Sequence, residues 1–100
     1  MAHVILTPQA HADLVRLEEF LWESQDPLAQ QLLDFLLDGL HVLTHQPGVG
    51  RPLPNGHREL IISRGRGGYL ARYVFDTKRQ SVLVLAIRHQ REAGYTDNEI

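Results

Sequence analysis

The chain contains no cysteine and no long apolar segment. Without cysteine it can form no disulfide framework, no thiolate nucleophile and no zinc site of the cysteine type. No apolar run approaches the roughly 18 residues that a membrane span requires. The N-terminal stretch MAHVILTPQAHADL also lacks the basic n-region and the long apolar h-region of a signal peptide. We therefore expect a soluble, cytoplasmic protein.

The length of 100 residues predicts a single domain over residues 1–100. A content of 43% hydrophobic and 22% charged residues is ordinary for a globular protein and excludes a disordered or collagen-like chain. We expect no cofactor, because no cofactor-binding motif is present.

The small net charge of −2 hides an uneven distribution along the chain. Residues 1–50 hold one basic residue and seven acids, whereas residues 51–91 hold nine basic residues and two acids. A basic half indicates an anionic partner such as nucleic acid, phosphate or an acidic protein segment. The alternative is that the two halves neutralise each other within the fold.

Two helical patterns follow a short β-branched strand at residues 3–7. Thr7–Pro8 and Asp26–Pro27 each combine an N-cap residue with proline at the first helical position. The first helix is predicted over residues 8–24, with Asp13 and the glutamates mostly off its apolar stripe of Ala10, Leu14, Leu17 and Leu21. The second is predicted to run to residue 45, with an apolar face of Ala29, Leu32, Leu33, Leu36, Leu37, Leu40 and Leu43. The short connection between them predicts an antiparallel hairpin.

Three strands are predicted in the second half of the chain, over residues 58–63, 69–76 and 81–88. Residues 46–57, with three prolines and three glycines, are predicted to form a surface loop. The segment SVLVLAIR is apolar on both faces, as expected of a central strand. The predicted fold is therefore α+β in the order β-α-α-β-β-β, with a helical hairpin packed on a small, mostly antiparallel sheet.

Two short motifs point only weakly to a ligand. His41 and His45 have the i, i+4 spacing of a metal pair, but zinc requires further ligands, so we predict no metal site. The RGRGG stretch at residues 64–68 lacks the Walker pattern and no helix follows it. We interpret its glycines as a hairpin connection, and its arginines, Arg64 and Arg66, as candidates for a phosphate-facing surface.

A sharper set of residues clusters around the last two strands: Arg58, Arg72, Arg88, His89 and Arg91. Guanidinium groups bind phosphates through two hydrogen bonds, and histidine is suited to proton transfer near neutral pH. Attack by an RNA 2′-hydroxyl would need such a base, acid and set of cations. The alternative is that Arg58 and Arg72 pair with Glu59 or helix carboxylates, while His89 merely ends a strand.

The element order, together with RELII, GGYLARYVFD and VLVLAIRHQREAGY, resembles the RelE/ParE superfamily of type II toxin–antitoxin toxins. The resemblance implies a small bacterial toxin that inhibits growth or stabilises plasmids and forms a hetero-oligomer with a cognate antitoxin. It also implies one of two targets. RelE-like members cleave messenger RNA in the ribosomal A site, whereas ParE-like members poison DNA gyrase without known catalytic residues.

Comparison of individual residues of this chain with the patterns of the two subfamilies favours a ParE-like toxin. RelE-like nucleases carry an arginine directly after the Gly-Tyr of the third strand, and here that position is Leu70. If the chain is nevertheless a nuclease, the resemblance assigns catalysis to His89, Arg91 and Tyr95. A third possibility is a degenerate member that acts only as an antitoxin-bound module. Target or phosphate binding is predicted at Arg58, Arg64, Arg66, Arg72 and Arg88.

Overall fold

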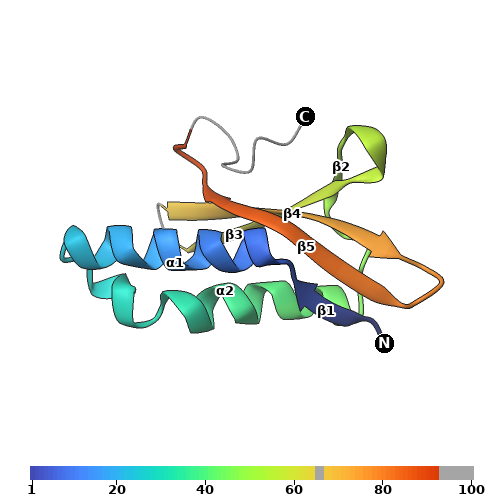
Figure 1. Cartoon of the computed structure of the whole chain (residues 1–100), viewed down its shortest axis with the longest axis horizontal. Helices are drawn as coiled ribbons and strands as arrows, with labels where there is room; N and C mark the ends of the chain where they lie inside the picture. Colours follow the sequence, from blue (N-terminus) through green and yellow to red (C-terminus); the bar gives the residue numbers. More distant parts are fainter. Residues whose placement is uncertain (65–66, 93–100) are drawn as a thin grey trace.

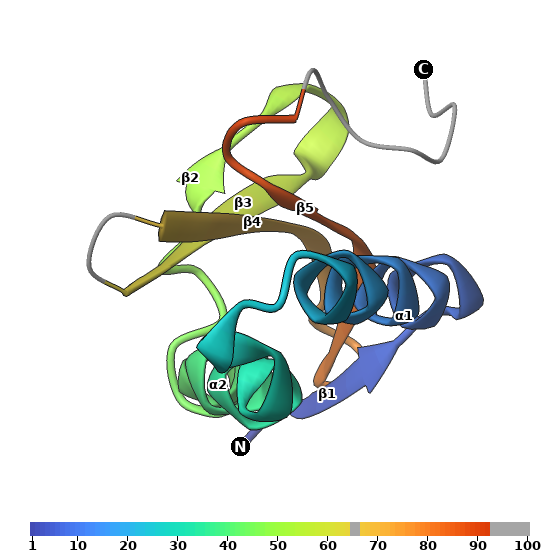
Figure 2. The same cartoon turned by 90° about the vertical axis from the view of Figure 1, so that its left-hand side faces the viewer.

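Two helices pack on one face of a five-stranded mixed sheet, which confirms the predicted α+β architecture (Figures 1 and 2). The computed structural model describes residues 1–64 and 67–92. The sheet has the order β1-β5-β4-β3-β2. Strands β3 (Arg58–Arg64), β4 (Gly67–Asp76) and β5 (Ser81–His89) form the predicted antiparallel meander. Strand β1 (His3–Leu6) lies parallel to β5.

Helix α1 (Pro8–Glu23) begins where the sequence predicts. The Thr7 side chain accepts a hydrogen bond from the backbone N–H of Ala10 at 3.2 Å, and Pro8 occupies the first turn. The predicted stripe of Ala10, Leu14, Leu17 and Leu21 is buried. The expectation that Asp13 lies off this stripe is wrong, since its side chain is also buried.

The second helical segment is not one continuous helix. The predicted cap is present, because the Asp26 carboxylate accepts from the Leu28 N–H at 2.9 Å. It starts a 3₁₀ turn, η1 (Pro27–Gln30), which is followed by α2 (Leu32–His41) and a second 3₁₀ turn, η2 (Val42–Thr44). With three residues per turn, a 3₁₀ segment brings residues three apart onto one side. This explains how Ala29 and Leu32, and likewise Leu40 and Leu43, are all buried in the core.

The predicted apolar face of α2 is too wide. Leu33 and Leu37 are exposed, because α2 approaches the sheet with its other flank. There, Gly39 lies against Ile62 of β3, and Phe35 packs edge-on to Tyr69 of β4. The absence of a Cβ at Gly39 permits this close approach. No helix in the described ranges is long and apolar enough to cross a bilayer.

Residues 46–57 are more ordered than a plain surface loop. Strand β2 (Arg51–Pro52) pairs with β3 at the sheet edge, and a 3₁₀ turn, η3 (Pro54–Gly56), closes the hairpin. Just before β2, the buried phenol of Tyr73 donates to the Pro47 carbonyl at 2.7 Å and accepts from the Gly50 N–H at 2.9 Å. Tyr73 therefore fixes the segment to β4.

A β-bulge interrupts the pairing of β4 and β5. Arg72 pairs with Ala86 but Tyr73 pairs with Val84, so Leu85 is the additional residue. Val84 and Ile87, three residues apart, consequently lie in the same hydrophobic core.

We predict that Gly39→Ala destabilises the protein. Alanine gains about 1 kcal/mol in helix propensity, but its Cβ would lie 2.6 Å from Cγ2 of Ile62. That methyl group belongs to a buried, β-branched side chain, whose χ1 rotation is restricted. The expected net loss is about 1–2 kcal/mol in urea unfolding. In an Ile62→Ala background the same change should stabilise. Gly48→Ala is the control, since nothing lies within 4 Å of its added Cβ. Destabilisation by Gly39→Ala in both backgrounds would refute this explanation.

Tyr73→Phe is expected to cost about 1–3 kcal/mol, because it leaves the buried Gly50 N–H without its acceptor. Burial raises the pKa of the Tyr73 phenol above its usual value. The neutral phenol therefore stabilises the fold fully below pH of about 10, and this contribution is lost as the pH rises through the folded-state pKa. The stability difference between wild type and Tyr73→Phe should narrow above pH of about 10. A difference independent of pH in that range would contradict the prediction.

Candidate functional site

The sheet face opposite the helices carries a row of charged side chains, which we call the open-face cluster: Arg51, Glu59, Arg72 and Arg88. Because Ile62 faces α2, strand alternation turns Glu59 to the other side. Arg51 and Arg72 are the direct partners of Glu59 on the two neighbouring strands, so all three share that face. Arg88 joins them two residues beyond Ala86, the partner of Arg72 on β5.

Glu59 is the centre of this cluster. Its side chain is only 4% exposed, and its carboxylate forms an ion pair with the Arg51 guanidinium. Arg72, which is 8% exposed, lies directly opposite it. A buried carboxylate is costly unless it is compensated, and these two arginines supply that compensation. With three arginines and one glutamate, the cluster keeps an excess of positive charge that suits an anionic partner.

Arg88 stabilises the turn that follows β5. Its Nη1 donates to the carbonyl of Glu92 at 2.9 Å and lies 3.3 Å and 3.4 Å from those of His89 and Gln90. Its partner on β4 is Leu70, which is buried. An apolar side chain therefore lies beside Arg88 on the open face.

A cavity of about 520 Å³, here called the hairpin-tip pocket, lies between the helical hairpin and the ends of β4 and β5. Its apolar lining comes mainly from Leu17, Phe20, Leu21, Leu28, Phe35 and Tyr69. Its polar lining comes from Arg16, Asp26, His89, Arg91 and Glu92. Such a pocket can accept an apolar group with a polar or charged group beside it.

Aromatic rings form one wall of this pocket. Tyr69 packs edge-on against Phe35, with ring centroids 6.4 Å apart, and against its cross-strand partner His89 at 5.1 Å. Burial, and then the nearby carboxylates of Asp26 and Glu92, raise the pKa of the Tyr69 phenol. Tyr69 is therefore a neutral packing residue at pH 7.

The geometry of His89 limits its chemistry. Its Nδ1 accepts a hydrogen bond from the backbone N–H of Arg91 at 3.1 Å. The neutral ring consequently carries its proton on Nε2, and its basic nitrogen is engaged by the backbone. A general base needs that nitrogen for the substrate proton. In this arrangement His89 can donate a hydrogen bond from Nε2, and its Nδ1 could take up a proton only after the contact with the Arg91 N–H is broken.

Behind the pocket, the buried Asp13 and the half-buried Arg16 of α1 hold the edge of β5. Asp13 Oδ2 accepts from the Ile87 N–H at 2.9 Å, and Arg16 Nη2 donates to the Ile87 carbonyl at 3.2 Å. Arg16 also forms ion pairs with Asp13, at 3.4 Å, and with Glu92. Glu92 Oε1 in turn accepts from the His89 N–H at 2.8 Å. This network fixes the position of the residues that line the pocket.

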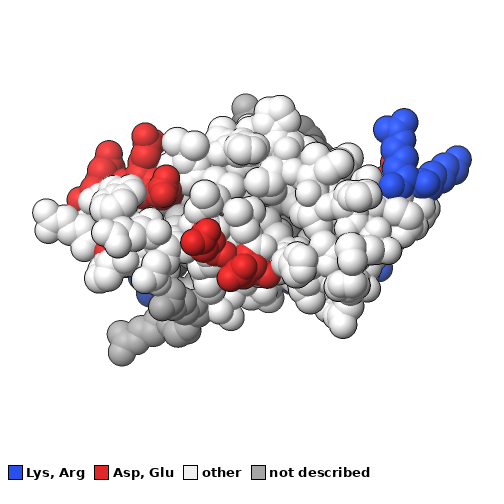
Figure 3. Space-filling view, turned by 90° about the horizontal axis from the view of Figure 1, so that it is seen from below, with Lys and Arg blue, Asp and Glu red and all other residues white. Residues whose placement is uncertain are grey.

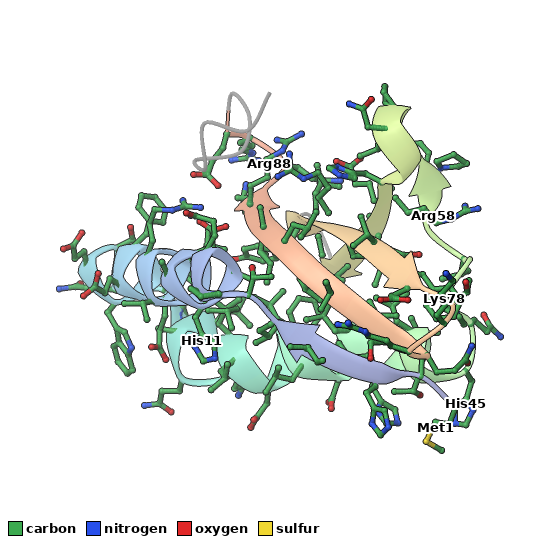
Figure 4. The ribbon with its side chains drawn as sticks, turned by 45° about the vertical axis from the view of Figure 1, so that its right-hand side comes forward. Met1, His11, His45, Arg58, Lys78 and Arg88 are labelled. Atoms are coloured by element: carbon green, nitrogen blue, oxygen red, sulfur yellow. The ribbon has the colours of Figure 1, made fainter. Side chains whose placement is uncertain are left out.

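The sequence-predicted site residues lie at three separate locations in the structure. Arg72 and Arg88 share the open face, while His89 and Arg91 line the hairpin-tip pocket. Arg58 instead pairs with Tyr73 and donates to the Gly50 carbonyl at 2.8 Å, and Figure 4 shows it well separated from Arg88. Arg64 ends β3, and Arg66 and Tyr95 lie outside the described residues. Residues 1–64 and 67–92 contain no group of three or more His, Asp or Glu that could hold a metal ion.

Sequence reasoning named Glu59 as a possible partner of Arg72, which lies opposite it, but it did not identify several other residues of these sites: Asp13, Arg16, Arg51, Tyr69 and Glu92. Asp13 had a usable signal, since it lies three residues after Ala10 and four before Leu17, at the edge of the apolar stripe. Arg51 had no such signal in the sequence, because it lies in a proline-rich stretch without periodicity.

Comparison with known proteins gives consistent results. Residues 4–94 match the family model described as the ParE toxin of the type II toxin–antitoxin system parDE. The chain is also similar to Toxin RelE3 of Caulobacter vibrioides, with 30% identity over 92 residues, covering 92% of this chain and 98% of that protein.

We predict that Asp13→Ala lowers the free energy of unfolding by about 2–3 kcal/mol, because it leaves the buried Ile87 N–H unsatisfied. Asp13→Asn should cost less, since an amide oxygen can still accept. Glu19→Ala, on the exposed side of the same helix, is the control and should change stability by no more than about 0.5 kcal/mol. Equal stabilities of Asp13→Ala and Glu19→Ala in urea unfolding would show that the network does not hold α1.

Proposed function

We propose that this chain, which belongs to the RelE/ParE superfamily of type II toxin–antitoxin toxins, is a ParE-like toxin that inhibits DNA gyrase by contact. In this proposal a cognate antitoxin binds and neutralises it in the cytoplasm. The open-face cluster is the contact surface for the anionic target or its complex with DNA. No bond is made or broken by the toxin itself.

The observation that carries the proposal is Leu70. In RelE-like nucleases the resemblance places an arginine at this position. Here an apolar side chain is buried between neighbouring strands and pairs with Arg88. The cluster therefore lacks one of the cations that would stabilise the charge developing on a cleaved phosphate.

The contacts of the other candidate residues also support binding rather than catalysis. Arg72 faces Glu59 across the strands, and Arg88 donates to backbone carbonyls. The basic nitrogen of His89 accepts from the Arg91 N–H. These side chains serve the architecture of the sheet and its last turn, and they lie on two different faces. A surface of this kind suits binding better than acid–base catalysis.

A RelE-like ribosome-dependent endoribonuclease is the second candidate. It is favoured by the hairpin-tip pocket, where aromatic side chains lie beside His89 and Arg91. Aromatic rings can stack on an unpaired base, and arginine can hold its phosphate. This candidate requires His89 to act through Nε2 as a proton donor.

Gyrase supercoiling and primer extension on ribosome-bound message should be measured side by side with the purified protein. We expect loss of supercoiling and gyrase-dependent DNA breaks at micromolar concentration, with no toxin-dependent cuts in the message. His89→Ala combined with Arg91→Ala should leave gyrase inhibition intact. Cleaved message that disappears in this double variant, with unaffected gyrase, would establish the nuclease instead.

The contact surface is tested with Arg51→Gln, since Arg51 is the most accessible member of the open-face cluster. Gyrase inhibition should weaken about tenfold, equivalent to about 1.4 kcal/mol. Arg79→Gln is the matched control, because Arg79 is an exposed arginine in the β4–β5 turn. Equal inhibition by the two variants would place the gyrase contact elsewhere.

A further inference from the structure

The outer surface of the helical layer exposes large apolar side chains along both helices. Val15 and Trp22 of α1 are 54% and 51% exposed, and Leu33 and Leu37 of α2 are 46% and 41% exposed. Val15 and Trp22 are seven residues apart, and Leu33 and Leu37 are four apart, so each pair lies on one side of its helix. Single exposed apolar residues are common, but a set repeated at helical spacing on two adjacent helices indicates a contact surface.

Contacts with the sheet show that these pairs face away from it. On α1, Asp13 and Arg16 lie on the flank that bonds to β5. Val15 and Trp22 lie on the opposite flank of the helix. On α2, Phe35 and Gly39 lie on the flank that meets Tyr69 and Ile62. Leu33 and Leu37 therefore lie on the flank turned from the sheet.

Acidic side chains border the apolar residues on both helices. Glu18 and Glu19 are neighbours of Val15 and Trp22 at helical spacing, and Asp34 and Asp38 directly follow Leu33 and Leu37. Arg16 is the only Lys or Arg in residues 1–50, and it is paired with Asp13 and Glu92. In Figure 3, acidic side chains form separate groups at the left and near the middle of an otherwise mostly uncharged surface, while Lys and Arg side chains project mainly at the right-hand end.

We infer that this surface, comprising Val15, Trp22, Leu33 and Leu37 with their flanking acids, is a docking site for a basic amphipathic helix of a partner protein. The apolar side of the partner helix would cover Leu33, Leu37 and Trp22, and the lysines or arginines of that helix would face the carboxylates. A third helix laid along two others buries apolar side chains by ordinary ridge-and-groove packing. The inference goes beyond the gyrase contact of the proposed function, which is placed on the open face.

The negative charge of this surface disfavours the binding of a second copy of this chain through the same surface. Two such surfaces would bring the same uncompensated acids together, and like charges at an interface disfavour association. An acidic partner segment is disfavoured for the same reason. That chemistry fits the open-face cluster on the other side of the sheet.

The chain contains a single tryptophan, so Trp22 reports directly on this surface. The probe is a leucine–lysine peptide of roughly 18 residues, patterned as an amphipathic helix, used below its own association concentration. Its counterpart has every lysine replaced by glutamate. We expect the lysine peptide to shift Trp22 emission saturably to shorter wavelength and to bind more weakly as salt is added. The glutamate peptide should produce no shift.

Leu33→Ser combined with Leu37→Ser should weaken binding of the lysine peptide at least about tenfold, or about 1.4 kcal/mol. Ile61→Ser is the matched control, because Ile61 is equally exposed but lies on the open face. Circular dichroism verifies that both variants are folded. Equal binding of the two peptides, or equal loss in both variants, would overturn the inference. So would a dimer in sedimentation that the leucine variant abolishes, since the surface would then bind a second copy.

Discussion

The hydrogen bond from the Ile87 N–H to the buried carboxylate of Asp13 joins the helical layer to the sheet. Strand β1 pairs with β5 only as far as Val84, so within residues 1–64 and 67–92 this edge of β5 has no strand partner beyond that point. A helix cannot offer a backbone ladder, because its own N–H and C=O groups are used internally. Side chains replace the ladder: Thr7 bonds to the carbonyls of Val84 and Leu85, and Asp13 and Arg16 to Ile87.

This arrangement also explains the β-bulge at Leu85. A bulge disrupts a regular ladder, and here it falls where individual side chains, which have no fixed repeat, complete the edge of β5. The bulge keeps Val84 and Ile87 in one core although they are three residues apart. It also sets Ala86 opposite Arg72 and Arg88 opposite Leu70. The geometry of the open-face cluster thus depends on how α1 is held at β5.

The sequence predicted the parts of the fold that follow from local rules. Three features were predicted correctly because each depends on residues close together in the chain. They are the helix caps at Thr7 and Asp26, the apolar stripe of α1 and the alternation of the last three strands. The predictions that were wrong concern residues whose burial depends on contacts with residues far away in the sequence. The exposure of Leu33 and Leu37 follows from the close approach of Gly39 to Ile62, and the burial of Asp13 from a bond to a residue in the last strand. The candidate site residues were chosen by residue type, but their division between the two faces of the sheet required the strand register.

The uneven charge of the chain has a structural meaning that the net value conceals. The acidic N-terminal half forms the helical layer, whereas Arg51, Arg72 and Arg88 of the second half lie on the open face, with the sheet between them. Arg16 links the helical layer to the turn after β5 through its ion pair with Glu92. The exposed acids of the helices and the arginine-rich open face therefore point toward solvent on opposite sides of the sheet. Because the two surfaces lie on opposite sides of one sheet, partners of opposite charge can occupy them without competing for the same residues.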